Sequence, residues 1–192
     1  MDEFSYLSVL LSIILGLAIT QILKGFRGIV LARTRVRMYW PVVAWAALLL
    51  LIDVQSWWAM FGLRSIASWT FPAFFVVLTQ TIVLYMLAAI VLPDFTGEKI
   101  DLSTHYHAHT RWFFGLLVLV LLISLGKDVV LTGHLPGRLN LAFHLAFIAI
   151  SLPAMFVRSP WYHQAQPVAA LLLFGAYIGL LFTRLPGDWI YK

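Results

Sequence analysis

Long apolar runs separated by short polar breaks cover the whole chain. Each run is close to the roughly 20 apolar residues that a helix needs to cross a bilayer. The breaks contain Arg, Gly and Pro, residues typical of loops between helices. The pattern predicts an all-α, polytopic integral membrane protein with a single domain over 1–192. Its six transmembrane helices are expected at about 4–30, 38–63, 71–92, 111–131, 139–157 and 160–182.

The composition agrees with this class. Hydrophobic residues make up 62% of the 192 residues and charged residues 11%, whereas soluble domains carry about 25% charged residues. The expected partner is therefore the lipid bilayer. The formal charge of +5 does not indicate nucleic-acid binding, because the basic residues lie in loops between apolar runs. The absence of Cys excludes disulfides, thiolate metal sites and thiol catalysis.

The basic residues also predict an orientation. Eight of the 13 Lys and Arg residues fall on one side of the predicted bundle, including the cluster Lys24, Arg27, Arg33, Arg35 and Arg37, and five fall on the other. Because cytoplasmic loops are enriched in Lys and Arg, both termini should face the non-cytoplasmic side. We expect a multi-pass protein of the cell membrane, in a bacterial inner membrane. The basic cluster could also attract anionic lipid, although its topological role already accounts for it.

Asp53 is the only charged residue between Met38 and Arg64 and lies near the middle of the second predicted span. A carboxylate there costs roughly 2.5–3.5 kcal/mol on insertion scales, so charged residues at such positions usually have a partner or line a cavity. Asp53 is therefore the first candidate for a functional residue.

Other polar residues are predicted at a similar depth. Asp53 lies eight residues in from Phe61, Gln80 nine in from Phe71 and His144 six in from Arg138. At 1.5 Å per residue, these three depths agree within about 5 Å. Lys127 and Asp128 lie slightly nearer the outer surface, and Trp57 should lie near the rim. The depths predict a polar pocket in the outer half of the bundle, lined by Asp53, Gln80, Lys127, Asp128, His144 and Trp57.

Each of these residues also has a structural explanation. Asp53 could pair with Lys127 or His144 only to neutralise its charge. His144 could be a hydrogen-bonded core residue, and Gln80 could join two helices. Lys127 and Asp128 could be an interfacial pair at a helix end.

Small and polar residues recur every four positions in the first span, at Ser8, Ser12, Gly16 and Thr20. Small side chains let helices approach closely in lipid. We expect this ridge to pack against another helix, either within the chain or in a homo-oligomer or membrane-protein partner. Close helix packing explains the ridge better than a permeation path does.

A histidine-rich segment, 101–111, lies on the predicted cytoplasmic side. If the fourth helix begins near Ser103, His105 and His109 lie one turn apart and could bind a metal together with His107, Asp101 or His163. A chance enrichment in an interfacial loop is the favoured explanation, and no cofactor is predicted. Haem is disfavoured because no second His matches the depth of His144.

Three functional hypotheses remain. The first is a small transporter or channel-like protein in which Asp53 and His144 exchange protons or hold a cation. The second is a non-catalytic membrane subunit or scaffold that assembles through the first span, and the third is a His-based metal-dependent enzyme. The sequence favours a non-enzymatic protein, because it has no phosphate-binding loop or nucleophile elbow. Ser124 and Ser151 have no His or Lys predicted within hydrogen-bonding distance.

Overall fold

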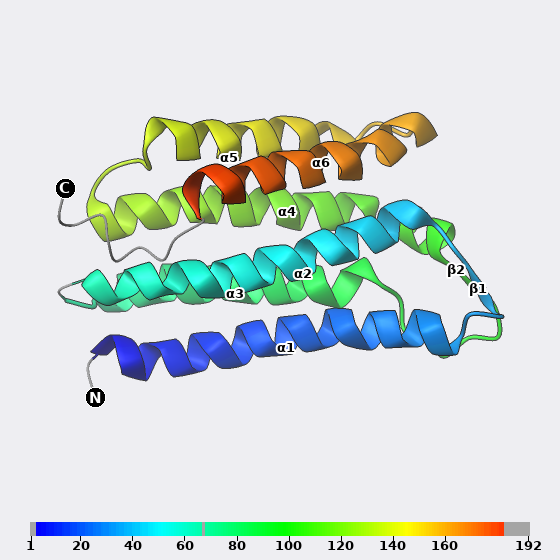
Figure 1. Cartoon of the computed structure of the whole chain (residues 1–192), viewed down its shortest axis with the longest axis horizontal. Helices are drawn as coiled ribbons and strands as arrows, with labels where there is room; N and C mark the ends of the chain where they lie inside the picture. The colour runs from blue at the N-terminus through cyan, green and yellow to red at the C-terminus, as the bar shows by residue number, and fades with distance from the viewer. Residues whose placement is uncertain (1–2, 67, 183–192) are drawn as a thin grey trace.

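The structure is a computed structural model that describes residues 3–66 and 68–182. Six long helices dominate it (Figure 1). They are α1 (Glu3–Leu31), α2 (Trp40–Met60), α3 (Phe71–Val91), α4 (Leu102–Thr132), α5 (Arg138–Ser151) and α6 (Pro160–Leu181). All six, with the 3₁₀ turns that extend α2 and α5, are long and apolar enough to cross a membrane. This confirms the predicted all-α class and the predicted number of long apolar helices.

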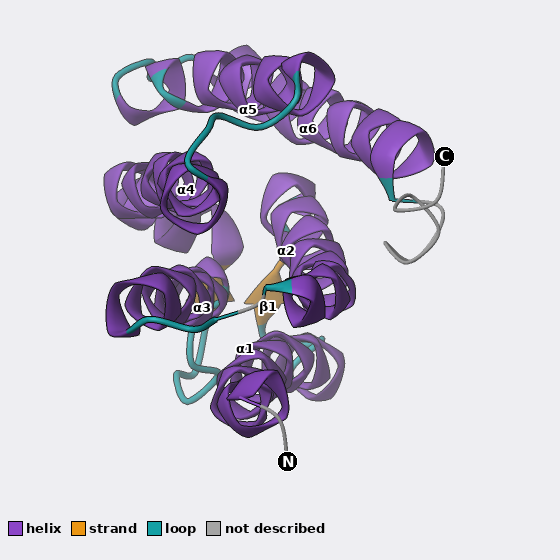
Figure 2. Ribbon diagram, turned by 90° about the vertical axis from the view of Figure 1, so that its left-hand side faces the viewer, coloured by secondary structure: helices purple, strands orange, loops and turns teal. Residues whose placement is uncertain are grey.

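The helices run antiparallel to their neighbours in sequence, so the bundle has two distinct ends (Figure 1). At the N-terminal end, α1, α3 and α5 begin and α2, α4 and α6 end. Glu3 Oε2 accepts a hydrogen bond there from the backbone N–H of Trp69, at 3.0 Å. Seen along the helices, α2 and α3 lie between α1 on one side and α4, α5 and α6 on the other (Figure 2).

A parallel sheet of two strands, each two residues long, lies at the opposite end, which we call the sheet end. Strand β1 (Val36–Arg37) follows α1, and strand β2 (Ile100–Asp101) precedes α4. Val36 pairs with Ile100 and Arg37 with Asp101. The Arg37 guanidinium also contacts the Asp101 carboxylate at 3.1 Å, the one ion pair among the described residues. The sequence analysis did not predict this sheet, because two-residue strands have no detectable periodicity.

Helix α4 begins nine residues before the predicted start at Arg111. Asp101 caps it: its Oδ1 accepts hydrogen bonds from the backbone N–H groups of Ser103, at 2.8 Å, and Thr104, at 3.2 Å. The bond from Thr104, with those from Ser103 and Arg37, lowers the pKa of Asp101. Capping by an Asp side chain satisfies N–H groups that the first turn leaves without partners. The histidine-rich segment is therefore the start of α4 and not a loop.

Two glycines bring α1 close to the end of α3 and the loop that follows it. A Cβ atom on Gly25 would lie 2.5 Å from Leu92 Cδ1, and one on Gly28 would overlap the ring of Phe95. On the same helix, Leu11, Leu15, Ala18 and Ile22 are buried at three- and four-residue spacings. This buried face packs α1 against the rest of the bundle.

Large apolar side chains cover much of the outside of the bundle. Phe71, Trp112, Trp161 and Leu172 are all more than 70% exposed. The core beneath them includes Trp45, whose ring lies 5.3 Å from that of Phe113 and 5.4 Å from that of Phe114. An apolar exterior of this extent suits contact with lipid.

Candidate functional site

A cavity of about 240 Å³ lies toward the N-terminal end of the bundle, between α2, α3, α4, α5 and the end of α6. A smaller cavity of about 80 Å³ adjoins it on the deeper side. The two share seven lining residues, and we call them together the polar cavity. The shared residues are Gln55, Ser56, Gln80, Leu84, Ser124, His144 and Tyr177.

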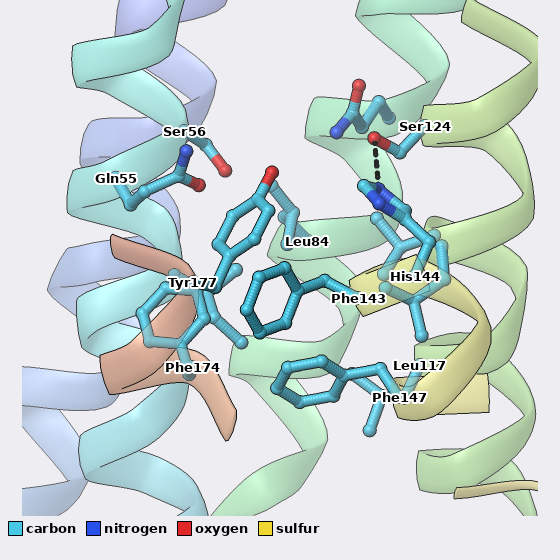
Figure 3. Close-up of a pocket in the computed structure, with 14 residues that line it drawn as sticks. Gln55, Ser56, Leu84, Leu117, Ser124, Phe143, His144, Phe147, Phe174 and Tyr177 are labelled. Atoms are coloured by element: carbon cyan, nitrogen blue, oxygen red, sulfur yellow. Dashed lines mark hydrogen bonds between the residues drawn. The ribbon is translucent and has the colours of Figure 1, made fainter. Parts of the chain in front are cut away.

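The deeper part of the polar cavity has polar groups on two facing sides and aromatic rings near its middle (Figure 3). Gln55 and Ser56 project from α2 across the cavity from His144 and Ser124. The aromatic rings of Phe143, Phe147, Phe174 and Tyr177 lie between these groups or beside them. Apolar walls with a few polar groups are typical of sites that bind small molecules.

His144 is buried and held at both ring nitrogens. Nδ1 lies 2.9 Å from the backbone carbonyl of Asn140, and Nε2 lies 3.1 Å from Ser124 Oγ (Figure 3). A carbonyl can only accept, so Nδ1 donates to Asn140, and Nε2 accepts from Ser124 in the neutral ring. A proton gained by the ring therefore goes to Nε2, on the side of the polar cavity.

Ser124 is a residue that the sequence analysis dismissed, and that interpretation is wrong. Ser124 lies eight residues in from Thr132 on α4, and His144 lies six in from Arg138 on α5. The two side chains therefore reach the same depth on adjacent antiparallel helices. The depth comparison used for Gln80 would have paired them.

Four of the six predicted pocket residues line the polar cavity, and Asp53 and Trp57 do not. Gln80, Lys127, Asp128 and His144 all line the larger part of the polar cavity. Lys127 and Asp128 are both half-buried. The residues lining this cavity thus include a cation, an anion and an imidazole, drawn from two adjacent helices.

Several lining residues were not predicted. Gln55 and Ser56 follow Asp53 on α2, and Asn140 precedes His144 by one turn on α5. Tyr177, on α6, donates a long hydrogen bond of 3.4 Å to Asn140 Oδ1. Tyr177 gave no signal in the sequence because an aromatic residue in an apolar span resembles an ordinary core residue.

Asp53 lies outside the set of residues that line the polar cavity. Its side chain is 1% exposed, and neither carboxylate oxygen has a hydrogen-bond partner among the described residues. It makes no ion pair with Lys127, and His144 is bonded to other groups. Ser56, three positions further along α2, lines the cavity. Ile52 and Gln55, on either side of Asp53 along α2, also line the polar cavity. Asp53 therefore lies at the depth of the cavity wall, on a different side of the helix.

Trp57 and part of the small-residue ridge line a different cavity. This cavity, of about 330 Å³, lies between α1 and the end of α2, and its lining includes Ser8, Ser12, Trp57 and Trp58. Further along the ridge, Gly16 and Thr20 are exposed, and a Cβ atom on Gly16 would have no atom within 4 Å. Among the described residues, no other helix packs over this part of the ridge.

The histidines near the sheet end form contacts with one another and with the backbone. The rings of His105 and His109 lie 4.4 Å apart. His105 Nε2 lies 3.0 Å from the carbonyl of Ile90, and His109 Nδ1 lies 2.9 Å from the carbonyl of His105. Within residues 3–66 and 68–182, no three His, Asp or Glu side chains are grouped so that they could hold a metal ion.

His163 has a clearer structural role. It is buried, its Nε2 donates to the carbonyl of Val157 at 2.8 Å, and its Nδ1 accepts from the Tyr106 hydroxyl at 2.9 Å. His163 therefore joins the start of α6 to the loop before it, through Val157, and to the first turns of α4, through Tyr106.

Comparison with known proteins found no match. No protein family matches the sequence, and no curated protein or solved structure matches the chain.

Proposed function

We propose that the protein is a small membrane transport protein whose polar cavity binds a small polar solute or a cation. The observation that supports this most directly is the cavity itself: about 240 Å³, inside a bundle of apolar helices, with Gln80, Lys127, Asp128 and His144 in its wall. Ionisable residues within membrane helices are costly and are commonly found on ion or substrate pathways. The cavity lies toward one end of the bundle, as a site filled from one side of a membrane would.

In this proposal His144 carries the proton. Its Nδ1 is committed to the Asn140 carbonyl, so protonation and release occur at Nε2 beside Ser124. Ionisable side chains within membrane helices commonly serve as proton relays in transport proteins. Asp53, which lies between the lining residues Ile52 and Gln55 on α2, is the next proton acceptor in this proposal.

The direct test measures proton flux into liposomes that contain the purified protein and a trapped pH-sensitive dye. A potassium gradient with valinomycin supplies the driving potential. We expect the wild type to acidify liposomes faster than protein-free liposomes do. The variants His144→Gln and Asp53→Asn should lower the rate to that of protein-free liposomes.

His134→Gln is the matched control, because His134 is exposed in the loop at the same end of the bundle and its ring bonds Thr132. This variant should keep the wild-type rate. Wild-type flux equal to that of protein-free liposomes would refute the proposal. Equal flux in His144→Gln and the wild type would refute the role given to His144.

The exposed part of the small-residue ridge favours a second candidate function, a membrane subunit that assembles through α1. Gly16 and Thr20 are accessible on the outside of the bundle, and small residues favour close helix association in lipid. If α1 packs against a partner there, Gly16→Leu should break the assembly isolated from native membranes. Size-exclusion chromatography with light scattering would measure this, and an unchanged mass would contradict it.

A further inference from the structure

A second polar cavity lies near the sheet end, on the other side of the bundle from the polar cavity. It has a volume of about 360 Å³ and lies between the last turns of α1 and the segment in which α3 ends and its loop begins. Three cations line it: Lys24, Arg27 and Arg35. We call it the basic cavity.

The charge of the basic cavity is unbalanced. Asp94 is its one acidic lining residue, and the described residues contain no ion pair between Asp94 and any of the three cations. The three cations therefore keep their capacity to bind an anion. Arg and Lys are the residues that proteins use most often to bind phosphate groups, Arg through paired N–H donors and Lys as a compact charge.

The position of Arg35 is fixed by the neighbouring loop. Its Nη1 donates to the carbonyl of Gly97 at 3.1 Å, and its own carbonyl accepts from the N–H of Ile100 at 3.0 Å. A side chain held in this way loses less conformational freedom when it binds a ligand. This distinguishes Arg35 from an ordinary exposed loop arginine.

The other walls of the basic cavity are apolar. Ala88 and Ala89 line it from α3, Leu92 lines it from the position after α3, and Leu31 lines it from α1. Gly25 and Gly28 also line it and lie directly against Leu92 and Phe95. A cavity with cations and an apolar wall matches a molecule that has both a phosphate and a hydrocarbon part.

The topological role of basic residues explains their presence at this end but not their convergence. Arg33 and Arg37 belong to the same cluster in the sequence, yet neither lines the basic cavity. Arg37 instead pairs with Asp101. Only some of the cations in this cluster surround one space, which general attraction to a membrane surface does not require.

We propose that the basic cavity binds the phosphate group of an anionic ligand, either the headgroup of an anionic phospholipid or free phosphate. Lys24 and Arg27 contact the phosphate from α1, and Arg35 contacts it from the loop after α1. The wall formed by Ala88, Ala89 and Leu92 contacts the glycerol and acyl part of a lipid. This proposal does not depend on the transport function.

Native mass spectrometry of the purified protein in detergent tests the proposal with phosphatidylglycerol as the probe. We expect one phosphatidylglycerol to bind more tightly than phosphatidylcholine. Removing one Lys or Arg near an anionic phosphate weakens binding about fivefold, so Lys24→Gln with Arg27→Gln should weaken it about 25-fold. Arg33→Gln with Arg111→Gln removes two exposed cations that lie outside the basic cavity, and it should leave binding unchanged.

Ala89→Phe provides a variant with unchanged charge. Ala89 is exposed and lines the basic cavity, so a Phe there should fill the space and abolish binding of phosphatidylglycerol without disturbing the core. Equal weakening by the two double variants, or equal binding of phosphatidylglycerol and phosphatidylcholine, would overturn the proposal. Full binding by Ala89→Phe would overturn it too.

Competition with inorganic phosphate distinguishes the two sources of the ligand. Lipid that still binds to the Lys24→Gln, Arg27→Gln variant marks binding outside the basic cavity. If millimolar phosphate displaces phosphatidylglycerol from the wild type but does not displace this remaining lipid from the variant, the basic cavity recognises the phosphate group alone. If phosphate fails to displace the lipid while Lys24→Gln with Arg27→Gln releases it, the ligand is the phospholipid.

Discussion

The buried carboxylate of Asp53 should reduce the stability of the protein, and replacing it with leucine should raise that stability. Leu has the same branching and the same number of side-chain heavy atoms as Asp, so it fills a similar space without the two polar oxygens. Those oxygens have no hydrogen-bond partner among the described residues, and the side chain is 1% exposed.

The size of the gain follows from this burial. At the centre of a membrane helix, Asp is less favourable than Leu by about 3–4 kcal/mol. The methyl groups of Leu are larger than the oxygens of Asp, and fitting them into the core costs up to about 1.5 kcal/mol of this gain. A net gain of about 2–3 kcal/mol remains. At about 2–4 °C per kcal/mol for a chain of this length, the melting temperature should rise by about 4–12 °C.

The assay is thermal unfolding in detergent, followed by circular dichroism at 222 nm. Asp128→Leu is the matched control, because Asp128 is half-buried and lines the polar cavity. Its carboxylate can stay hydrated, so this variant should not gain stability. A lower melting temperature for both Asp53→Leu and Asp53→Asn would refute the reasoning, since it would mean that the carboxylate makes a favourable interaction in the folded protein.

Three further predictions concern packing, the buried hydrogen bond and pH. Gly25→Ala should destabilise the protein by about 1–3 kcal/mol in chemical denaturation, because the new Cβ would lie 2.5 Å from Leu92 Cδ1. Gly16→Ala, with nothing within 4 Å, should not destabilise it. Tyr106→Phe should cost about 1–3 kcal/mol in the same assay, because it leaves a buried imidazole nitrogen without its donor. Asp101→Ala should speed hydrogen exchange in the first turn of α4. In the wild type this protection should persist above the usual pKa of Asp and be lost as the pH falls through the lowered pKa of Asp101.

Each of these predictions has an outcome that would contradict it. Equal free energies of unfolding for Gly25→Ala and Gly16→Ala would mean that Gly25 is not in close contact with Leu92. Unchanged stability of Tyr106→Phe would mean that the hydroxyl is not bonded to the ring. Exchange in α4 that does not respond to pH between 2 and 5 in the wild type would mean that another group caps the helix.

The sequence was sufficient to predict the six helices, because each needs a long apolar run and the breaks between runs are short. It was less informative where a helix begins in polar residues. The first turns of α4 contain Ser103, Thr104 and His105, which resemble a loop until the capping bonds of Asp101 are known. The pairing of β1 with β2 depends on contacts between residues more than 60 positions apart, and such contacts leave no local pattern.

The sequence predicted the depth of the candidate site residues along their helices, but not which side of each helix faces the cavity. Counting residues from the ends of the spans placed Gln80 and His144 at one level, and the structure has both in the wall of one cavity. The same count placed Asp53 at that level, but depth does not specify the side of α2 that faces the cavity. Tyr177 and Ser124 were missed for a different reason, because each is common in membrane helices for packing alone.

The short sheet has a consequence for the order in which the chain folds during synthesis. Val36 can pair with Ile100 only after the ribosome has reached Ile100, which is 64 positions further along the chain. At about 5–20 residues per second, β1 remains unpaired for about 3–13 s, while α2 and α3 are being made. During synthesis the nascent α1–α3 segment therefore depends on contacts between its helices, without the sheet, to hold its arrangement.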